Sequence, residues 1–216
     1  MSGPLRPDTS EMAAVHKVFR SSFGSAPDLI GSAKGDDARR ALIADYYANV
    51  MCFLEVHHHG EEELLFPLLA ERAPGHRDLV DRATSDHHKA LAALEDSKGA
   101  LAAWQKSGDA ESADLERSLA ALDGVLSAHL DMEEAEIVPL AGDHVTVEEW
   151  GMLPAHGFAN FTGDKVWLIL GLVRENFTDE QRAIMLAHMP PPAVEMWQSM
   201  GEASFDQMMA EVRQNA

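Results

Sequence analysis

Histidine and glutamate residues occur in this chain at spacings that could bind metal ions. His57 and Glu61 are four residues apart, and so are His129 and Glu133. In an α-helix, residues four apart lie on the same face, so each pair can direct an imidazole nitrogen and a carboxylate toward one point. Imidazole and carboxylate donors together suit iron, with manganese or zinc as substitutes. The two pairs therefore predict a metal site that two helices share.

The two pairs belong to an internal repeat in which the second copy lies 72 residues after the first. The same shift relates His16 to His88 and Pro67 to Pro139, without a gap. Each copy therefore supplies one single histidine and one His-x-x-x-Glu pair. One metal ion rarely takes so many protein ligands of this kind, whereas two ions bridged by carboxylates would use them all. The predicted metal ligands are His16, His57, Glu61, His88, His129 and Glu133.

The predicted ligands lie at positions where polar groups are costly. In the segment 110–142, apolar residues recur at steps of three and four, and His129 and Glu133 fall on that stripe. His57 and Glu61 fall on a comparable stripe in the segment 36–71. A charged carboxylate on a buried helix face costs several kcal/mol unless it is paired or bound to metal. Two such residues at repeat-related positions indicate a functional site.

Two neighbouring histidines compete for the single-histidine position of the second copy. Leu91 and Leu94 follow His87 at helical spacing and give it the better apolar stripe. The repeat, in contrast, aligns His88 with His16. We therefore expect His88 to be the ligand, with His87 as the alternative.

A second alternative concerns the first His-x-x-x-Glu pair. His58 and Glu62 are also four residues apart, and they share a helical stripe with apolar residues on either side of them. The residue aligned with His58 in the second copy is Leu130, which has no donor atom. The repeat therefore favours His57 and Glu61, and we expect His58 to lie outside the set of ligands.

The rest of the chain must place these residues on facing helices. Apolar residues at helical spacing, with Gly and Pro as breakers, predict a loop over 24–35 and long helices over 11–23, 36–71, 76–106 and 110–142. Long helices with short connections are typical of an up-down-up-down four-helix bundle. We therefore expect residues 1–146 to form an all-α bundle that carries the metal site.

Residues 147–216 are expected to form a C-terminal extension of further helices. One helix should start at Thr178, a typical N-cap residue, and the proline run at 190–192 should separate two helices. The apolar residues of this region need burial, either on the bundle or on a second copy of the chain. The sequence leaves both arrangements open.

Composition and charge exclude several classes of partner. Among the 216 residues, 36 are Asp or Glu and 17 are Lys or Arg, which gives a formal net charge of −19. Phosphate groups repel such a surface, so we expect neither nucleic acid nor an anionic membrane as a partner. The longest apolar run, at 166–173, is too short to cross a bilayer, and residues 1–10 do not resemble a signal peptide. Cys52 is the single cysteine, so no intrachain disulfide can form, and we expect a cytoplasmic protein.

On these residues the chain resembles the hemerythrin-like (HHE cation-binding) family. The motifs that carry the resemblance are HHHGEEELLFP at 57–67, HLDMEE at 129–134, HKVF at 16–19 and HKAL at 88–91. The resemblance covers residues 11–143. It implies a non-haem di-iron centre in the core of an up-down-up-down bundle.

The sequence departs from the oxygen-carrying members of that family. Those have five histidines, two of them on the third helix, whereas here the residue four after His88 is Ala92. The fourth helix has His-x-x-x-Glu where the oxygen carriers place an aspartate one residue later. The resemblance therefore implies sensing of oxygen, nitric oxide or iron, peroxide handling or iron delivery, rather than stable oxygen carriage.

We accordingly expect a protein that holds two iron ions and binds or reacts with a small ligand (oxygen, nitric oxide or peroxide) at a carboxylate-bridged centre. A weak peroxide- or oxygen-linked oxidoreductase activity is one form that this reaction could take. The alternative is a metal-dependent regulatory or interaction module that senses iron or redox state through the C-terminal helices. A homodimer is the assembly considered for either function.

Overall fold

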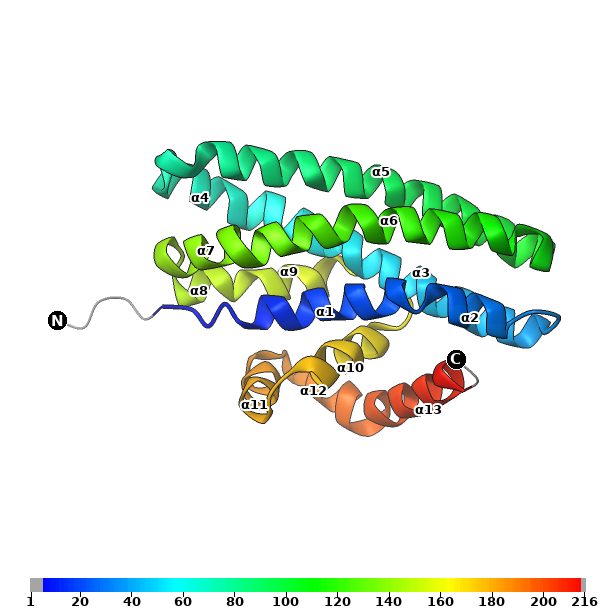
Figure 1. The fold of residues 1–216 in the computed structure, drawn as a ribbon. Helices are drawn as coiled ribbons and strands as arrows, with labels where there is room; N and C mark the ends of the chain where they lie inside the picture. Colours follow the sequence, from blue (N-terminus) through cyan, green and yellow to red (C-terminus); the bar gives the residue numbers. More distant parts are fainter. Residues whose placement is uncertain (1–5, 215–216) are drawn as a thin grey trace.

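The computed structural model describes residues 6–214, apart from the side chain of His188, and these residues form helices and turns without a β-strand. Four long helical rods lie side by side and alternate in direction (Figure 1). Shorter helices from the C-terminal part of the chain lie beside two of the rods. The predicted all-α bundle with C-terminal helices is therefore confirmed.

Two of the four rods are single helices, and each of the other two contains one π-helical turn. The first and third rods are α1 (Glu11–Gly24) and α5 (Arg77–Ser107). The second rod consists of α3 (Asp37–Gly60), a π-helical turn (Glu61–Leu65) and α4 (Phe66–Arg72). The fourth consists of α6 (Ser112–Met132), a π-helical turn (Glu133–Ile137) and α7 (Val138–His144). Short 3-10 turns at Pro74–His76 and Gly108–Glu111 link the later rods.

The segment expected to be a loop, 24–35, contains a short helix, α2 (Ala26–Ser32). Pro27 lies in the first turn of this helix, where its missing N–H is not needed. Leu29 and Ile30 are buried in the main hydrophobic cluster and hold α2 against the bundle. Gly35 has a φ of 74°, a left-handed conformation that lets the chain turn back into α3. The helix-breaking residues therefore mark the two ends of a helix.

The C-terminal part of the chain forms a series of short helices. They are α8 (Val147–Trp150), α9 (Met152–Asn160), α10 (Val166–Asn176), α11 (Asp179–His188), α12 (Pro191–Met196), a π-helical turn (Trp197–Gly201) and α13 (Glu202–Arg213). Thr178 caps α11 in a capping box with Gln181. The predicted helix start at Thr178 and the break at the proline run are both confirmed.

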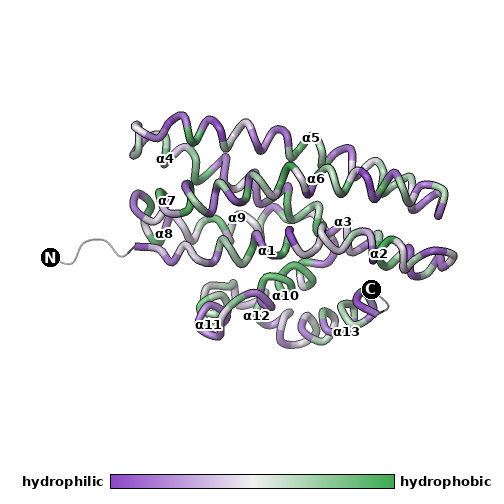
Figure 2. The backbone as a smooth tube through the Cα atoms, in the orientation of Figure 1, coloured by the Kyte–Doolittle hydropathy of each residue, from purple (hydrophilic) through white to green (hydrophobic). Residues whose placement is uncertain are grey.

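The C-terminal helices pack on the bundle. α9 contacts α3, and α10 contacts both α1 and α3. Leu168 and Leu172 of α10 belong to the same hydrophobic cluster as Phe19 of α1 and Val50 of α3. Figure 2 shows the hydrophobic character of α10 beside the bundle. The apolar residues of α10 are thus buried within one chain, whereas Val147, Met152, Ile184 and Met200 of the same region are exposed. The division of this region from the bundle at residue 147 stays a prediction.

A second, smaller hydrophobic cluster fills the other end of the bundle around Leu65, Leu69 and Ile137. On each of the four rods, a buried histidine or glutamate lies between the buried residues of the two clusters. The donor atoms of these side chains lie close together in the middle of the bundle. Among the described residues, no helix combines the length and the apolar character that a bilayer crossing needs.

Candidate metal centre

Histidine and glutamate side chains gather in the middle of the bundle, between the two hydrophobic clusters. Every one is buried or nearly so, and the most exposed side chain, that of His57, is only 9% exposed. Their donor atoms form two groups within 4.8 Å, namely His16, His57, Glu61 and Glu133, and His58, His87 and His129. The structure thus brings together five of the six predicted ligands and adds two further histidines.

Each glutamate of this cluster is the first residue of a π-helical turn. The residue after each turn donates its backbone N–H to the carbonyl five residues earlier: Phe66 donates to Glu61, and Val138 donates to Glu133. Pro67 and Pro139 come next in the chain. Because proline has no N–H and its ring clashes with the carbonyl four residues earlier, a regular α-helix is disfavoured here. The repeated proline therefore accounts for the widened turn, a feature frequent at functional sites.

Glu133 lies between the two groups of donor atoms. Its Oε2 is 3.5 Å from Nε2 of His16 and 3.3 Å from Nε2 of His129. Its Oε1 is 3.6 Å from Nε2 of His87. These separations are longer than those of good N–H···O hydrogen bonds, which centre on about 2.9–3.0 Å. The atoms are spaced as donors around shared ions would be.

Glu61 occupies the matching place in the first copy of the repeat. Its Oε2 is 3.6 Å from Nε2 of His57 and 3.5 Å from Nε2 of His87. Glu61 therefore also faces a histidine of each group. Two carboxylates that each face both groups could bridge two cations.

Many donor atoms of the cluster have no hydrogen-bond partner among the described residues. They are Nε2 of His16, His57 and His87, both ring nitrogens of His58 and His129, Oε2 of Glu61 and both carboxylate oxygens of Glu133. A single unpaired buried polar group costs about 1–3 kcal/mol, so this many in one place indicates an occupant. Imidazole and carboxylate donors fit cations of the iron type. The residues present therefore fit a metal centre.

Burial sets the charges of the cluster. Burial lowers the pKa of both His57 and His58 well below the usual value for histidine, so these rings are neutral at pH 7 and free to bind metal. Burial raises the pKa of Glu61, and the nearby Glu133 adds to this. Burial opposes the charge of Glu133 as well, but its histidine neighbours hold its pKa below the usual value. The pKa values of the two acids are therefore shifted in opposite directions, as expected for carboxylates that share one site.

Two further glutamates orient histidines of the cluster from outside. Nδ1 of His16 lies 3.0 Å from Oε1 of Glu134, and Nδ1 of His87 lies 3.0 Å from Oε1 of Glu62. An ionised carboxylate only accepts hydrogen bonds, so Nδ1 donates in each pair and Nε2 is left free toward the centre. Such carboxylate partners fix the ring and make a metal-binding imidazole more basic. Glu62 thus supports His87 from outside the cluster that contains Glu61.

The structure corrects the choice between His87 and His88. His87 is fully buried in the cluster, whereas His88 is exposed, so the expectation that His88 joins the site is wrong. The buried face of α5 runs through Ala83, His87 and Ala90 at steps of four and three. One residue along an α-helix is a rotation of about 100°, which turns His88 away from that face.

The gapless repeat misled because its two copies differ in length. His16 precedes His57 by 41 residues, whereas His87 precedes His129 by 42. The first copy connects its helices through α2, and the second through the 3-10 turn at Gly108–Glu111. The alignment is therefore correct for the His-x-x-x-Glu pairs and one residue out of register for the preceding helix.

His58 also belongs to the cluster, although the repeat placed it outside. Its side chain is fully buried, and its ring stacks on that of His87 with centroids 4.1 Å apart. The ring of His129 is 5.3 Å away. Five histidines therefore meet here. The residue four after His87 is Leu91, so the fifth histidine comes from α3.

A sequence signal for His58 did exist. Tyr47, Met51, Leu54 and His58 follow one another at steps of four, three and four, and all are buried. The stripe that contains His57 is also buried, because it faces α1, where the rings of His16 and Phe19 lie 5.4 and 5.3 Å from that of His57. An α-helix covered on both sides has two valid stripes, and the repeat could select only one of them.

Replacing His87 by alanine is expected to lower the amount of bound metal, whereas His88→Ala should leave it unchanged. Loss of a direct imidazole ligand should weaken binding by more than the roughly 10–100-fold that loss of an outer hydrogen-bond partner costs. Metal content per chain after dialysis measures both variants. Equal metal loss in the two variants would contradict the helix face described here.

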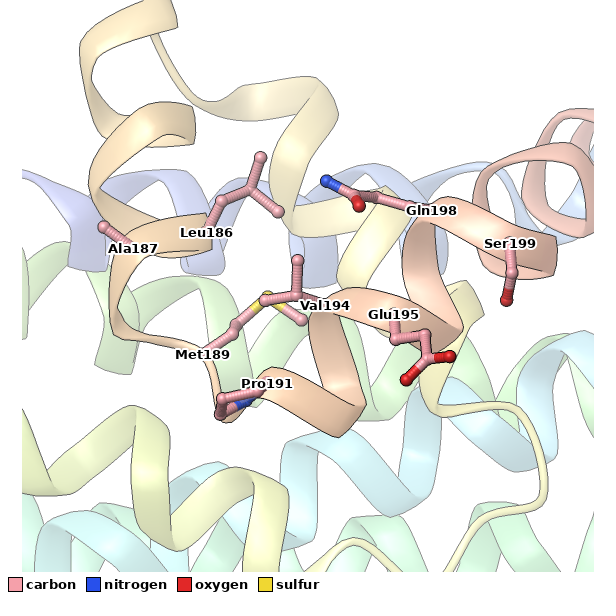
Figure 3. Close-up of a pocket in the computed structure, with 8 residues that line it drawn as sticks. All are labelled: Leu186, Ala187, Met189, Pro191, Val194, Glu195, Gln198 and Ser199. Atoms are coloured by element: carbon pink, nitrogen blue, oxygen red, sulfur yellow. The ribbon is translucent and has the colours of Figure 1, made fainter.

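A surface groove lies away from this cluster, between α11, α12 and the π-helical turn that follows α12. Figure 3 shows Leu186, Met189, Val194 and Glu195 among the residues around it. Among the lining residues that the structure describes, Glu195 supplies one carboxylate and none is a histidine. The described imidazole and carboxylate donors gather instead in the buried cluster, which is the candidate centre.

A protein-family model described as hemerythrin HHE cation binding domain matches residues 8–141. The match covers more than half of the chain and includes every residue of the buried cluster. Comparison with curated proteins and with solved structures gave no match.

Proposed function

Because this chain belongs to the hemerythrin HHE cation-binding family, we propose that it is a non-haem di-iron protein that binds or reacts with oxygen, nitric oxide or peroxide. The observation that carries the proposal is the buried cluster, in which imidazole and carboxylate donors without partners form two adjacent groups. Manganese or zinc could replace iron at such donors. A structural zinc ion takes four ligands and favours sulfur, so seven nitrogen and oxygen side chains argue for two ions of the iron type.

The geometry suggests how the side chains would divide between two ions. One ion would take its imidazoles from His16 and His57. The other would take them from His58, His87 and His129. The two buried carboxylates, which face both groups, would bridge the ions. When bound, the iron ions would supply the redox chemistry and a coordination position for the small ligand.

Aromatic side chains surround the cluster and keep bulk water out. The rings of Phe19 and Phe53 lie 5.3 and 6.4 Å from that of His57, and the ring of Phe66 lies 5.1 Å from that of His87. His57 is the histidine with the greatest exposure, so a ligand would reach the centre beside it, past the two phenylalanines. A dry apolar surrounding favours reversible binding, whereas entry of water and protons favours turnover.

Anaerobic reconstitution tests the proposal. Metal-free protein should take up two ferrous ions per chain, and exposure to air, nitric oxide or peroxide should then change its near-ultraviolet and visible absorption. Glu133→Ala, treated in the same way, controls for iron bound outside the cluster. Protein that binds no iron, or whose iron spectrum responds to none of the three ligands, would contradict the proposal.

The packing of the C-terminal helices favours a second candidate, a regulatory module that reports metal occupancy or redox state to a partner. α9 and α10 lie on α1 and α3, which carry His16, His57 and His58. Metal binding that stabilises these two helices would also stabilise what packs on them. Limited proteolysis of the same metal-free and iron-loaded samples tests this. Identical cleavage over residues 151–163 in both would count against the second candidate.

A further inference from the structure

Arg20 makes the two carboxylate–histidine pairs of the centre unequal. It lies four residues after His16 on α1, and its Nη2 donates to Oε1 of Glu134 at 3.3 Å. That oxygen is the same atom that accepts from Nδ1 of His16 at 3.0 Å. Arg20 also donates to Oδ1 of Asp131 at 2.7 Å and to the carbonyl of Ser127 at 3.4 Å. A guanidinium held at three points is therefore fixed behind the His16 ligand.

The matching pair has no such cation. Oε1 of Glu62 faces Nδ1 of His87 at 3.0 Å. Within the part of the chain that the structure describes, no Arg or Lys lies within ion-pair distance of Glu62. The residue that corresponds to Arg20, four after His87, is Leu91, which packs against the hydrophobic core. The two carboxylate–histidine pairs therefore have the same Nδ1–Oε1 distance, but only Glu134 also accepts a hydrogen bond from an arginine.

We propose that Arg20 lowers the affinity of the metal position that contains His16 relative to the position that contains His87. The inference rests on the proposed two-metal function. The Glu134 oxygen divides its charge between the guanidinium and the imidazole, so it makes His16 a weaker donor than Glu62 makes His87. The guanidinium also repels a cation bound at His16. Arg20 contacts no donor atom of the cluster, so it acts through Glu134 as a positioning residue.

Stepwise titration of the metal-free full chain with ferrous iron, under anaerobic conditions in a calorimeter, tests this inference. Wild-type protein should show two steps with different dissociation constants. Arg20→Gln keeps a hydrogen-bond donor and removes the charge, so it should tighten the weaker step by on the order of tenfold and leave the tighter step unchanged. Arg20→Lys keeps the charge and should leave both steps near their wild-type values.

Two matched variants assign the steps to positions. Glu134→Gln should weaken only the step at His16, and Glu62→Gln only the step at His87. Circular dichroism of each metal-free variant checks that the fold is retained. The inference is overturned if Arg20→Gln leaves the ratio of the two constants unchanged or weakens either step, or if Arg20→Lys behaves like Arg20→Gln. Uptake of fewer than two ions by the wild type would instead overturn the proposed function.

Discussion

Replacing Glu133 by alanine should remove both of the proposed metal ions from the protein. The two oxygens of Glu133 face Nε2 atoms of His16, His87 and His129 at 3.3–3.6 Å, across both donor groups. The substitution would take one donor from each ion and delete the negative charge that offsets the repulsion between the ions. We expect metal affinity to fall by more than about a hundredfold, beyond the effect of losing an outer partner. Elemental analysis after dialysis should find about two metal ions per wild-type chain and almost none in the variant.

Glu136 provides the matched control in the same π-helical turn. Its side chain is 51% exposed and pairs with Arg82 on the surface, an interaction worth about 0–1 kcal/mol. Glu136→Ala should therefore keep its metal. Metal-free Glu133→Ala should remain folded by circular dichroism, because the hydrophobic clusters on both sides of the centre are unchanged. Retention of both ions by Glu133→Ala would refute the bridging role.

The carboxylates of the centre were the part of the site that the sequence defined best. Glu61 and Glu133 each follow a histidine by four residues and sit on apolar stripes, where a charged group is costly. Because of this cost, a His-x-x-x-Glu pair on an apolar stripe is rare by chance, and here the pair occurs twice, 72 residues apart. Both residues are buried, at 1% exposure. Local helix geometry was sufficient here because each pair lies within one turn of a single rod.

The prediction of the other histidines, His87 and His58, depended on the register and burial of their helices, which a sequence repeat does not fix. The two copies of the repeat differ by one residue in the length of the connection between their helices, and this residue decides between His87 and His88. An alignment without gaps could not account for it, because only the first connection contains a helix, α2. The stripe of α5 alone pointed to His87. His58 was missed for another reason, since α3 is buried on two faces, one toward His16 of α1 and the other toward His87 of α5. Both faces carry a periodic apolar stripe, and the repeat selected only the stripe that contains His57.

Acidification should destabilise the metal-free protein through His57 and His58. Burial lowers the pKa of both, so below pH 6.5, the usual value, the unfolded chain takes up two protons that the folded chain refuses. Burial raises the pKa of Glu61, so above its usual value of 4.5 the folded chain retains one proton that the unfolded chain has released. The unfolded chain therefore takes up protons at His57 and His58 that the folded chain does not, and the proton that folded Glu61 retains offsets part of this difference. The combined contribution of the three groups to the free energy of unfolding should fall as the pH is lowered from 6.5 toward 4.5.

His58→Leu tests this effect, because it removes one of the two histidines whose protonation is disfavoured in the folded chain. Urea unfolding of metal-free protein from pH 4.5 to 6.5 should give a profile of unfolding free energy against pH that is flatter than that of the wild type. His59→Leu is the matched control, since the neighbouring His59 is exposed, and it should run parallel to wild type. Parallel profiles for His58→Leu and wild type would show that the His58 ring does not resist protonation. Iron-loaded wild type should keep its stability to lower pH, because a cation bound only by the folded state adds its binding free energy and occupies the ring nitrogens that protons would otherwise take.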